Sequence, residues 1–131
     1  MRLLRLGVGL FLIAHGLVHL MYLAPPADAA HNPFVAESRW FPKALGMDPT
    51  TAKAVAGTLA VATATLFLIS GIAVFASVSI WKPMAVMGSM VSLVLMLLFL
   101  HPWLMFGLVI DVAIIASVLS LNVPSSLLEK G

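Results

Sequence analysis

The chain has 131 residues, of which 62% are hydrophobic and 9% are charged. This composition is typical of a membrane protein, and at about 20 residues for each span the length allows about four spans in a single domain. The net charge is +2, and the chain contains no cysteine. These features exclude disulfides, thiolate metal sites and a CxxC redox pair, and the scattered basic residues argue against nucleic acid as a partner.

Four apolar segments predict an all-α fold, an integral membrane four-helix bundle that forms one domain over residues 1–131. The predicted spans are about 3–23, 55–77, 83–100 and 103–121. None of the prolines falls inside a helix in this division, and the tryptophans lie outside the spans or at their ends, where the headgroup layer favours them. We therefore expect a four-helix bundle that is surrounded by the lipid bilayer.

The first predicted span carries two histidines, His15 and His19, which share one helix face because they are four residues apart. A signal peptide is the alternative for this segment, since Arg2 and Arg5 precede the apolar run and residues 27–29 have the A-x-A cleavage form. The apolar run is longer than an ordinary signal core, so we expect a retained span.

The connection 24–51 is predicted to be an interfacial loop. Its segment 34–45 mixes aromatic and charged residues, which suits a short element lying on the membrane surface. The segment is either an ordinary linker or a lid over the mouth of the bundle. Asp48 followed by Pro49 predicts the N-terminus of the next helix.

Small residues recur every four positions on the second and third predicted spans, a spacing that lets helices pack closely in lipid. These positions are Ala52, Ala56, Ala60 and Ala64, followed by Gly88 and Ser92. We favour packing seams inside the bundle over a face that binds a partner.

Four residues stand out: His15, His19 and Asp111 lie within the predicted spans, and His101 lies at the turn before the last span. From a rise of about 1.5 Å per residue, His15 and Asp111 lie roughly 18 Å and roughly 17 Å from the side that carries the termini. An ionised Asp at this depth is unfavourable by at least about 2.5 kcal/mol, so we expect Asp111 to face the interior, to be protonated or to meet a donor such as His15. His19 lies closer to the far surface. The four groups are therefore predicted to form a ladder, a row of polar side chains from the far surface to the middle of the membrane, in the order His101, His19, His15 and Asp111.

Three interpretations of these polar groups are open. The first is structural, with the His rings bonded to backbone groups or to hydroxyls such as that of Ser92. The second is a proton relay or a site for a quinone-like headgroup. The third is a divalent metal or haem site, with His15 and His19 as possible ligands and His101 as a possible haem partner.

Gly107 lies one turn before Asp111 on the same helix face. The space that it leaves beside the carboxyl group suits either a ligand group or another helix.

Both termini are expected in the cytoplasm, because the basic residues closest to the first span lie at its beginning. On the same side as the termini we count Arg2, Arg5, Lys82 and Lys130, and on the other side Arg39, Lys43 and Lys53.

The stretch RLGVGLFLIAHGLVHL, residues 5–20, resembles the opening of DoxX-like membrane proteins, which have an Arg, a glycine-dotted apolar helix and a His-Gly pair, here His15-Gly16. The last helix, FGLVIDVAII, is also similar, whereas His19 stands where many members have a Lys. The resemblance implies a four-helix bundle in a bacterial cytoplasmic (inner) membrane, often accessory to a quinone-linked or redox-stress oxidoreductase complex.

We therefore expect an accessory, non-catalytic membrane subunit of an oxidoreductase or respiratory assembly, with His15 and Asp111 near a quinone or proton route. The alternatives are a small proton-coupled transporter that works as a homo-oligomer, and a haem or metal-binding membrane protein. The sequence has no nucleophile–base pair, no phosphate-binding glycine loop and no close pair of carboxylates, so we do not expect an enzyme acting on its own.

Overall fold

The structure, a computed structural model, describes residues 2–24, 28 and 31–120. Within them the chain is all-helical, and four helices are long and apolar enough to cross a membrane, as the composition predicts. The predicted cleavage site at 27–29, except for Asp28, lies outside the described residues, as do Leu121 and Lys130. The elements are α1 (Arg2–Val18), η1 (His19–Leu23), η2 (Ala36–Ser38), α2 (Trp40–Ala44), α3 (Pro49–Phe75), α4 (Trp81–Leu98), η3 (Pro102–Leu104) and α5 (Met105–Ser120).

Helix α3 begins at Pro49, earlier than the apolar run that starts at residue 55. The cause is the cap predicted from the sequence, since the Asp48 side chain accepts hydrogen bonds from the Thr51 backbone N–H at 3.0 Å and from its hydroxyl at 2.5 Å. Lys53 in the first turns pairs with Glu37 at 3.2 Å. The first turns of α3 are therefore polar, and hydropathy alone could not find them.

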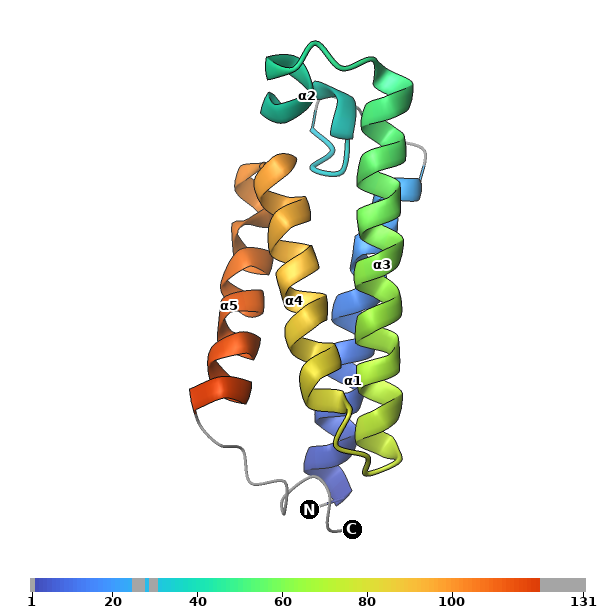
Figure 1. Cartoon of the computed structure of the whole chain (residues 1–131), viewed down its shortest axis with the longest axis vertical. Coiled ribbons are helices and arrows are strands. Elements are labelled where there is room, and N and C mark those ends of the chain that lie inside the picture. Colours follow the sequence, from blue (N-terminus) through green and yellow to red (C-terminus); the bar gives the residue numbers. More distant parts are fainter. Residues whose placement is uncertain (1, 25–27, 29–30, 121–131) are drawn as a thin grey trace.

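The helices pack in the order α1, α3, α4 and α5, each along the next, whereas the backbones of α1 and α5 stay farther apart (Figure 1). Asp111 is the one buried residue of α5, whose apolar side chains otherwise face outward or are half-buried. The α1–α5 side is therefore the most loosely closed side of the bundle, and a carboxyl group lies at its centre.

Close contacts between α1, α3 and α4 are made by small residues. The alanines at positions 52, 56, 60 and 64 are all buried, which confirms the packing seam predicted on α3. Phe67 is fully buried, and a Cβ added at Gly16 would lie 2.6 Å from its Cβ atom. A Cβ added at Gly88 would lie 3.3 Å from the ring of Phe67, so α4 also approaches this side chain closely.

The segment predicted to lie in the interface forms η2 and α2, which cover the end of the bundle at the top of Figure 1. The indole N–H of Trp40 donates a hydrogen bond to the carbonyl oxygen of Leu97 at 2.7 Å, and Phe41 lies edge-on to Phe99. The lid segment, defined as residues 34–45, is thus attached to the end of α4.

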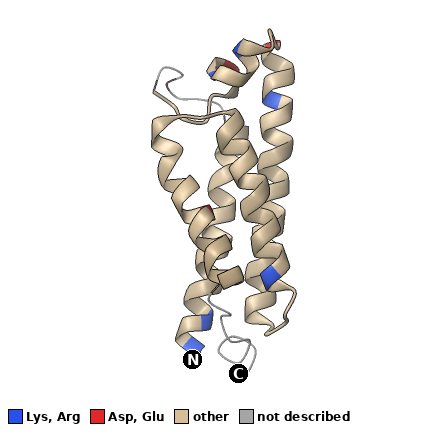
Figure 2. Ribbon diagram, turned by 60° about the vertical axis from the view of Figure 1, so that its left-hand side comes forward, with Lys and Arg blue, Asp and Glu red and all other residues tan. Residues whose placement is uncertain are grey.

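Within the part of the chain that the structure describes, Lys and Arg lie at the two ends of the molecule (Figure 2). At the end where α1 begins, the Arg5 guanidinium donates a hydrogen bond to the Ser77 hydroxyl in the turn between α3 and α4. The described region between the two ends contains no Lys or Arg, as is usual for a membrane-spanning region.

Candidate functional site

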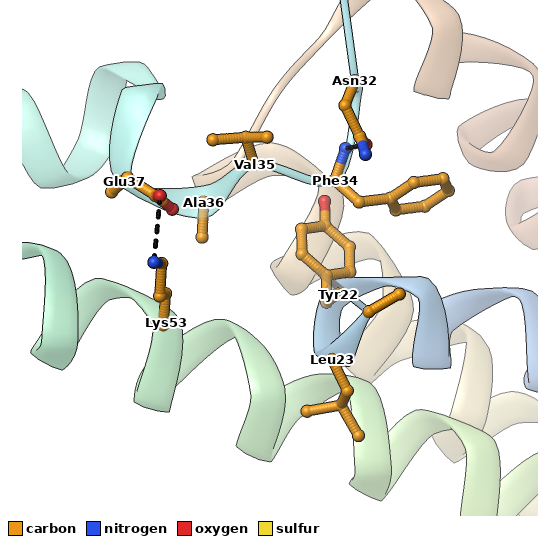
Figure 3. A pocket seen from close by; sticks show the side chains of 9 residues that line it. Tyr22, Leu23, Asn32, Phe34, Val35, Ala36, Glu37 and Lys53 are labelled. Atoms are coloured by element: carbon orange, nitrogen blue, oxygen red, sulfur yellow. Dashed lines mark hydrogen bonds and ion pairs between the residues drawn. The ribbon is translucent and has the colours of Figure 1, made fainter. Parts of the chain in front are cut away.

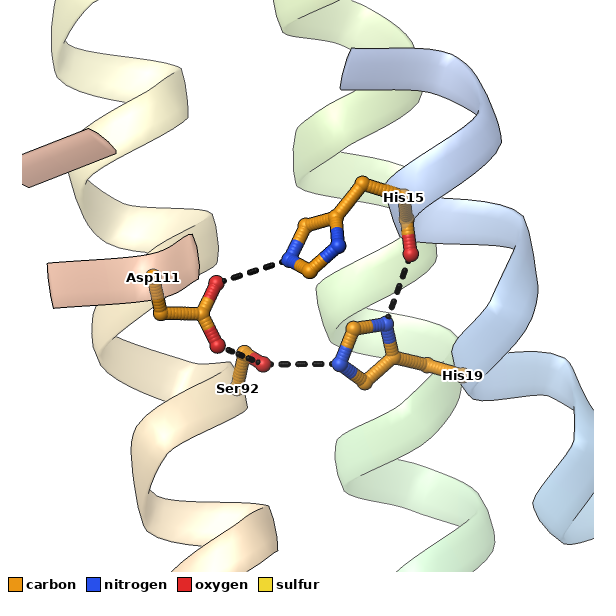
Figure 4. A network of polar contacts seen from close by, with 4 residues as sticks. All are labelled: His15, His19, Ser92 and Asp111. Carbon is orange, nitrogen blue, oxygen red and sulfur yellow. Dashed lines mark hydrogen bonds and ion pairs between the residues drawn. The ribbon is translucent and has the colours of Figure 1, made fainter. Parts of the chain in front are cut away.

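The structure brings together three of the four predicted polar residues, and it adds Ser92 of α4 (Figure 4). His15 Nε2 lies 2.9 Å from Asp111 Oδ1, which is the contact expected from their matched depths. The Ser92 hydroxyl lies 2.5 Å from Asp111 Oδ2 and 2.7 Å from His19 Nε2. Together the four side chains form a hydrogen-bonded network, which we call the His–Asp network.

A change of helix type helps to position His19. The α-helix ends at Val18 and a 3-10 helix begins at His19, so carbonyl oxygens at the end of α1 lie near side chains of the next turn. The His19 ring uses one of them, because its Nδ1 lies 3.0 Å from the His15 carbonyl oxygen. A carbonyl can only accept, so His19 Nδ1 carries a hydrogen and Nε2 faces Ser92.

The network is buried within the membrane-spanning part of the bundle. Asp111 and Ser92 are 0% exposed, His19 is 3% exposed, and the side chain of His15 is 9% exposed. Phe67 lies edge-on to the His15 ring, with 5.0 Å between ring centroids. Because apolar rings surround the network, a net charge on it would be strongly unfavourable.

His101 does not belong to the network, so the predicted ladder of four groups is not formed. It lies at the turn before η3, where its Nδ1 accepts a hydrogen bond from the Trp103 backbone N–H at 3.2 Å. Desolvation and the positive charge of Arg39 lower the pKa of His101 from its ordinary value. Its described role is that of a helix cap, and none of its described contacts reaches His15 or His19.

A cavity of about 320 Å³ adjoins the network between α1 and α5. Both His15 and His19 line it, and its other walls are apolar and aromatic, including Phe34, Trp103 and Ile110. We call it the histidine pocket. An apolar cavity with a few polar groups is the usual form of a small-molecule site.

Gly107 also lines the histidine pocket, and it makes room for a neighbouring helix. A Cβ added at Gly107 would lie 2.6 Å from Cε and 2.8 Å from Sδ of Met96. The space predicted beside Asp111 is therefore partly filled by Met96 of α4, and the remainder belongs to the pocket.

A second cavity, of about 380 Å³, lies between the lid segment and the ends of η1 and α3 (Figure 3). The Glu37–Lys53 ion pair lies on one side of it, and Tyr22 on the other (Figure 3). Tyr22 and Phe34 line both cavities, and their rings meet edge-on with centroids 5.2 Å apart. This ring pair forms a shared wall between an interfacial cavity and the histidine pocket.

A metal ion bound by His15 and His19 is the third interpretation that the sequence left open. The ligand atoms of His15, His19 and Asp111 all lie within 4.8 Å of one another. The same atoms already form the hydrogen bonds of the network, so an ion would have to replace the contacts to Asp111 and Ser92. We therefore assign these atoms to hydrogen bonding.

The sequence identified Ser92 as a small packing residue and as one hydroxyl that could pair with the histidines. The signal for Ser92 is its place one turn after Gly88, since a hydroxyl on a helix face packed within a bundle needs a polar partner. Which helix supplies that partner depends on lateral packing, and no single-helix pattern contains this information.

No protein-family model matches the chain, and neither a curated protein nor a solved structure gives a match to it. The resemblance to DoxX-like proteins stays a prediction from the sequence.

Proposed function

We propose that the chain is an accessory, non-catalytic subunit of an oxidoreductase or respiratory assembly in a bacterial cytoplasmic membrane, and that it binds the headgroup of a quinone in the histidine pocket. The observation that supports this most is a pocket between the spans and the first connection, where two histidine rings adjoin apolar walls. The DoxX-like resemblance of residues 5–20 favours the same assignment.

The reduced form of a quinone has the hydrogen-bonding groups that suit this pocket. The oxidised ring carries carbonyl oxygens that accept hydrogen bonds, and the reduced ring carries hydroxyls that donate them. His15 Nδ1 makes no hydrogen bond to any described residue, whereas His15 Nε2 is held by Asp111. With its hydrogen on Nε2, His15 offers an acceptor at Nδ1, and aromatic walls such as Trp103 suit a flat ring.

The first experiment measures binding of the reduced form of a short-chain benzoquinone, kept reduced under anaerobic conditions, to the full chain in lipid nanodiscs by quenching of tryptophan fluorescence. His15→Ala is expected to weaken binding about tenfold, which corresponds to about 1.4 kcal/mol and is typical of one hydrogen bond to a polar ring. Leu119→Ala, on the exposed face of α5, is the control. Equal affinities for the wild type and His15→Ala would contradict the proposed site.

The second experiment tests the assembly. The protein is extracted gently from its native membrane and its complexes are identified by mass spectrometry. Recovery with oxidoreductase subunits is expected. Recovery as a bare homo-oligomer would contradict the accessory role and would favour the proton-coupled transporter.

A further inference from the structure

The His–Asp network consists of four contacts, and each of them needs one hydrogen. They are His15 Nε2 to Asp111 Oδ1, Asp111 Oδ2 to Ser92 Oγ, Ser92 Oγ to His19 Nε2, and His19 Nδ1 to the His15 carbonyl oxygen. The last contact fixes its hydrogen on His19, because a carbonyl oxygen only accepts.

The ordinary solution states of these groups do not supply enough hydrogens. Neutral His15, neutral His19 and the Ser92 hydroxyl bring one hydrogen each, and an ionised Asp111 brings none. With three hydrogens for four contacts, one contact joins two acceptor atoms whose lone pairs face each other in a buried site. One additional proton completes all four contacts and makes the network neutral, which is the charge that an apolar membrane interior favours.

The additional proton has two places in which all four contacts are made. In one arrangement Asp111 is protonated at Oδ2 and donates to Ser92, whose hydroxyl donates to His19 Nε2. In the other, Asp111 is ionised and accepts from the Ser92 hydroxyl, while both nitrogens of His19 are protonated. The O–H bond at Asp111 breaks as a new one forms at Ser92 Oγ, and the original Ser92 O–H bond breaks as an N–H bond forms at His19.

We propose that the network holds one mobile proton, which Ser92 transfers between Asp111 and His19, and that its position controls how strongly His15 accepts a proton from the pocket. When the proton is on His19, the ionised carboxylate faces the Nε2–H of His15 and makes Nδ1 a better acceptor for a quinol hydroxyl. The effect of this proton on a bound quinol rests on the proposed function. The presence of the additional proton in the network is tested without a quinone.

The groups that face the network are few. His15 comes from α1, His19 from η1, Ser92 from α4 and Asp111 from α5, and α3 contributes the ring of Phe67. Within the described part of the chain, no other titratable side chain forms a hydrogen bond or an ion pair with these four groups.

Two substitutions separate the transfer of the proton from the structure of the network. Asp111→Asn keeps all four contacts, because its amide oxygen accepts from His15 and its N–H donates to Ser92, but no proton can leave it. Ser92→Ala removes one oxygen atom and breaks the connection between Asp111 and His19. Neither substitution changes the shape of the site much.

The test is nitrogen NMR of the full chain in lipid nanodiscs with ¹⁵N-labelled histidine, recorded without quinone between about pH 5 and about pH 8. In the wild type, the His19 Nε2 signal is expected between the positions of protonated and unprotonated imidazole nitrogen. In Asp111→Asn and Ser92→Ala it is expected to shift to the unprotonated position, while His19 Nδ1 stays protonated. His31, exposed and 2.8 Å from Asp28, gives an internal reference for a surface His–Asp pair.

The inference is overturned if the His19 Nε2 signal has one position in the wild type and in both variants, or if His19 Nδ1 carries no proton. Thermal unfolding of both variants checks that they fold. A shift as expected together with failed quinone binding would remove only the proposed function. Normal quinone binding without the shift would remove only the relay.

Discussion

Asp111 is a carboxylic acid at the buried position of an otherwise largely apolar helix. α5 has the highest average hydrophobicity of the four long helices, yet the residue that it buries is the carboxyl group. In lipid an apolar side chain gains little by turning inward, whereas a carboxyl group gains hydrogen bonds from His15 and Ser92. Asp111 therefore sets the rotation of α5 about its axis.

At the residue scale we predict a pH-dependent contribution of Asp48 to stability. Hydrogen bonds from Thr51 lower the pKa of this carboxyl group from its ordinary value. The stabilisation is therefore complete above the pKa of an unfolded Asp, and it is lost as the pH falls through the lowered pKa of the folded state. Asp48→Ala is expected to lower the unfolding temperature in nanodiscs near neutral pH.

The matched control is Asp48→Asn, which keeps an oxygen acceptor for the Thr51 backbone N–H and does not titrate. It is expected to retain most of the stability near neutral pH and to lose the acid dependence. If the wild type and Asp48→Asn respond alike to acid, the cap is not the group that titrates.

At the scale of elements, the α1–α3 interface depends on the absence of side chains. A Cβ added at Gly71 of α3 would lie 2.7 Å from the carbonyl oxygen of Gly9 and 2.5 Å from Cγ1 of Ile13. The carbonyl belongs to the backbone of α1 and cannot rotate away, so the helices would have to separate. This interface is held at a distance that only glycine permits.

We predict that Gly71→Ala destabilises the protein by about 1–3 kcal/mol, which is the usual cost of overpacking. Gly7→Ala is the control, because a Cβ there has no atom within 4 Å and alanine favours the helix. Unfolding in mixed detergent, followed by circular dichroism, measures both. A Gly71→Ala variant as stable as Gly7→Ala would show that α1 and α3 pack less closely than described.

The elements also show how far sequence reasoning reaches in this chain. Apolar runs located four spans, and Asp48 with Pro49 marked the beginning of α3 better than hydropathy did. Depth along the helix axis brought His15 and Asp111 to one level, and their contact follows from it. The Ser92 hydroxyl was one partner that the sequence suggested for the histidines, and its contact with His19 confirms it. Its contact with Asp111 and the histidine pocket could not be predicted, because they depend on which helices are neighbours, and depth carries no information about lateral order.

The same limit explains His101, which was expected to join His19 in a ladder. Its position near the membrane surface follows from the sequence, but its ring is used by the Trp103 backbone N–H in the tight turn before η3. The preference of a turn for a local acceptor outweighs a longer-range contact, because the local hydrogen bond needs no additional ordering of the chain.

At the scale of the whole molecule, the packing order leaves one open side, between α1 and α5. There the described hydrogen bond between His15 and Asp111 joins two helices whose backbones stay apart, and the histidine pocket lies beside it. Phe34, the first residue of the lid segment, also lines this pocket, so the pocket lies at the lid end of the open side. For a ligand dissolved in lipid, we expect entry between α1 and α5.

Orientation in the membrane is the last property that we predict, and the sequence makes it convenient to test because the chain has no cysteine. Thr50 lies in the first turn of α3 and Ser79 in the turn between α3 and α4, and both are exposed. Arg2, Arg5 and Lys82 lie at the Ser79 end, and this charge favours the cytoplasmic side for it. In intact cells a membrane-impermeant maleimide is expected to label Thr50→Cys and to label Ser79→Cys only after permeabilisation.

Leu68→Cys, in the middle of α3 and exposed toward lipid, is the control that should resist labelling in both conditions. The reverse pattern for the two ends would mean that the protein is inserted with its termini outside, and the lid segment would then face the cytoplasm. Labelling of both ends from the outside would contradict a complete crossing by α3. Because Thr50 and Leu68 lie on α3 and Ser79 follows its end, the labelling pattern reports the crossing by α3 and its direction together.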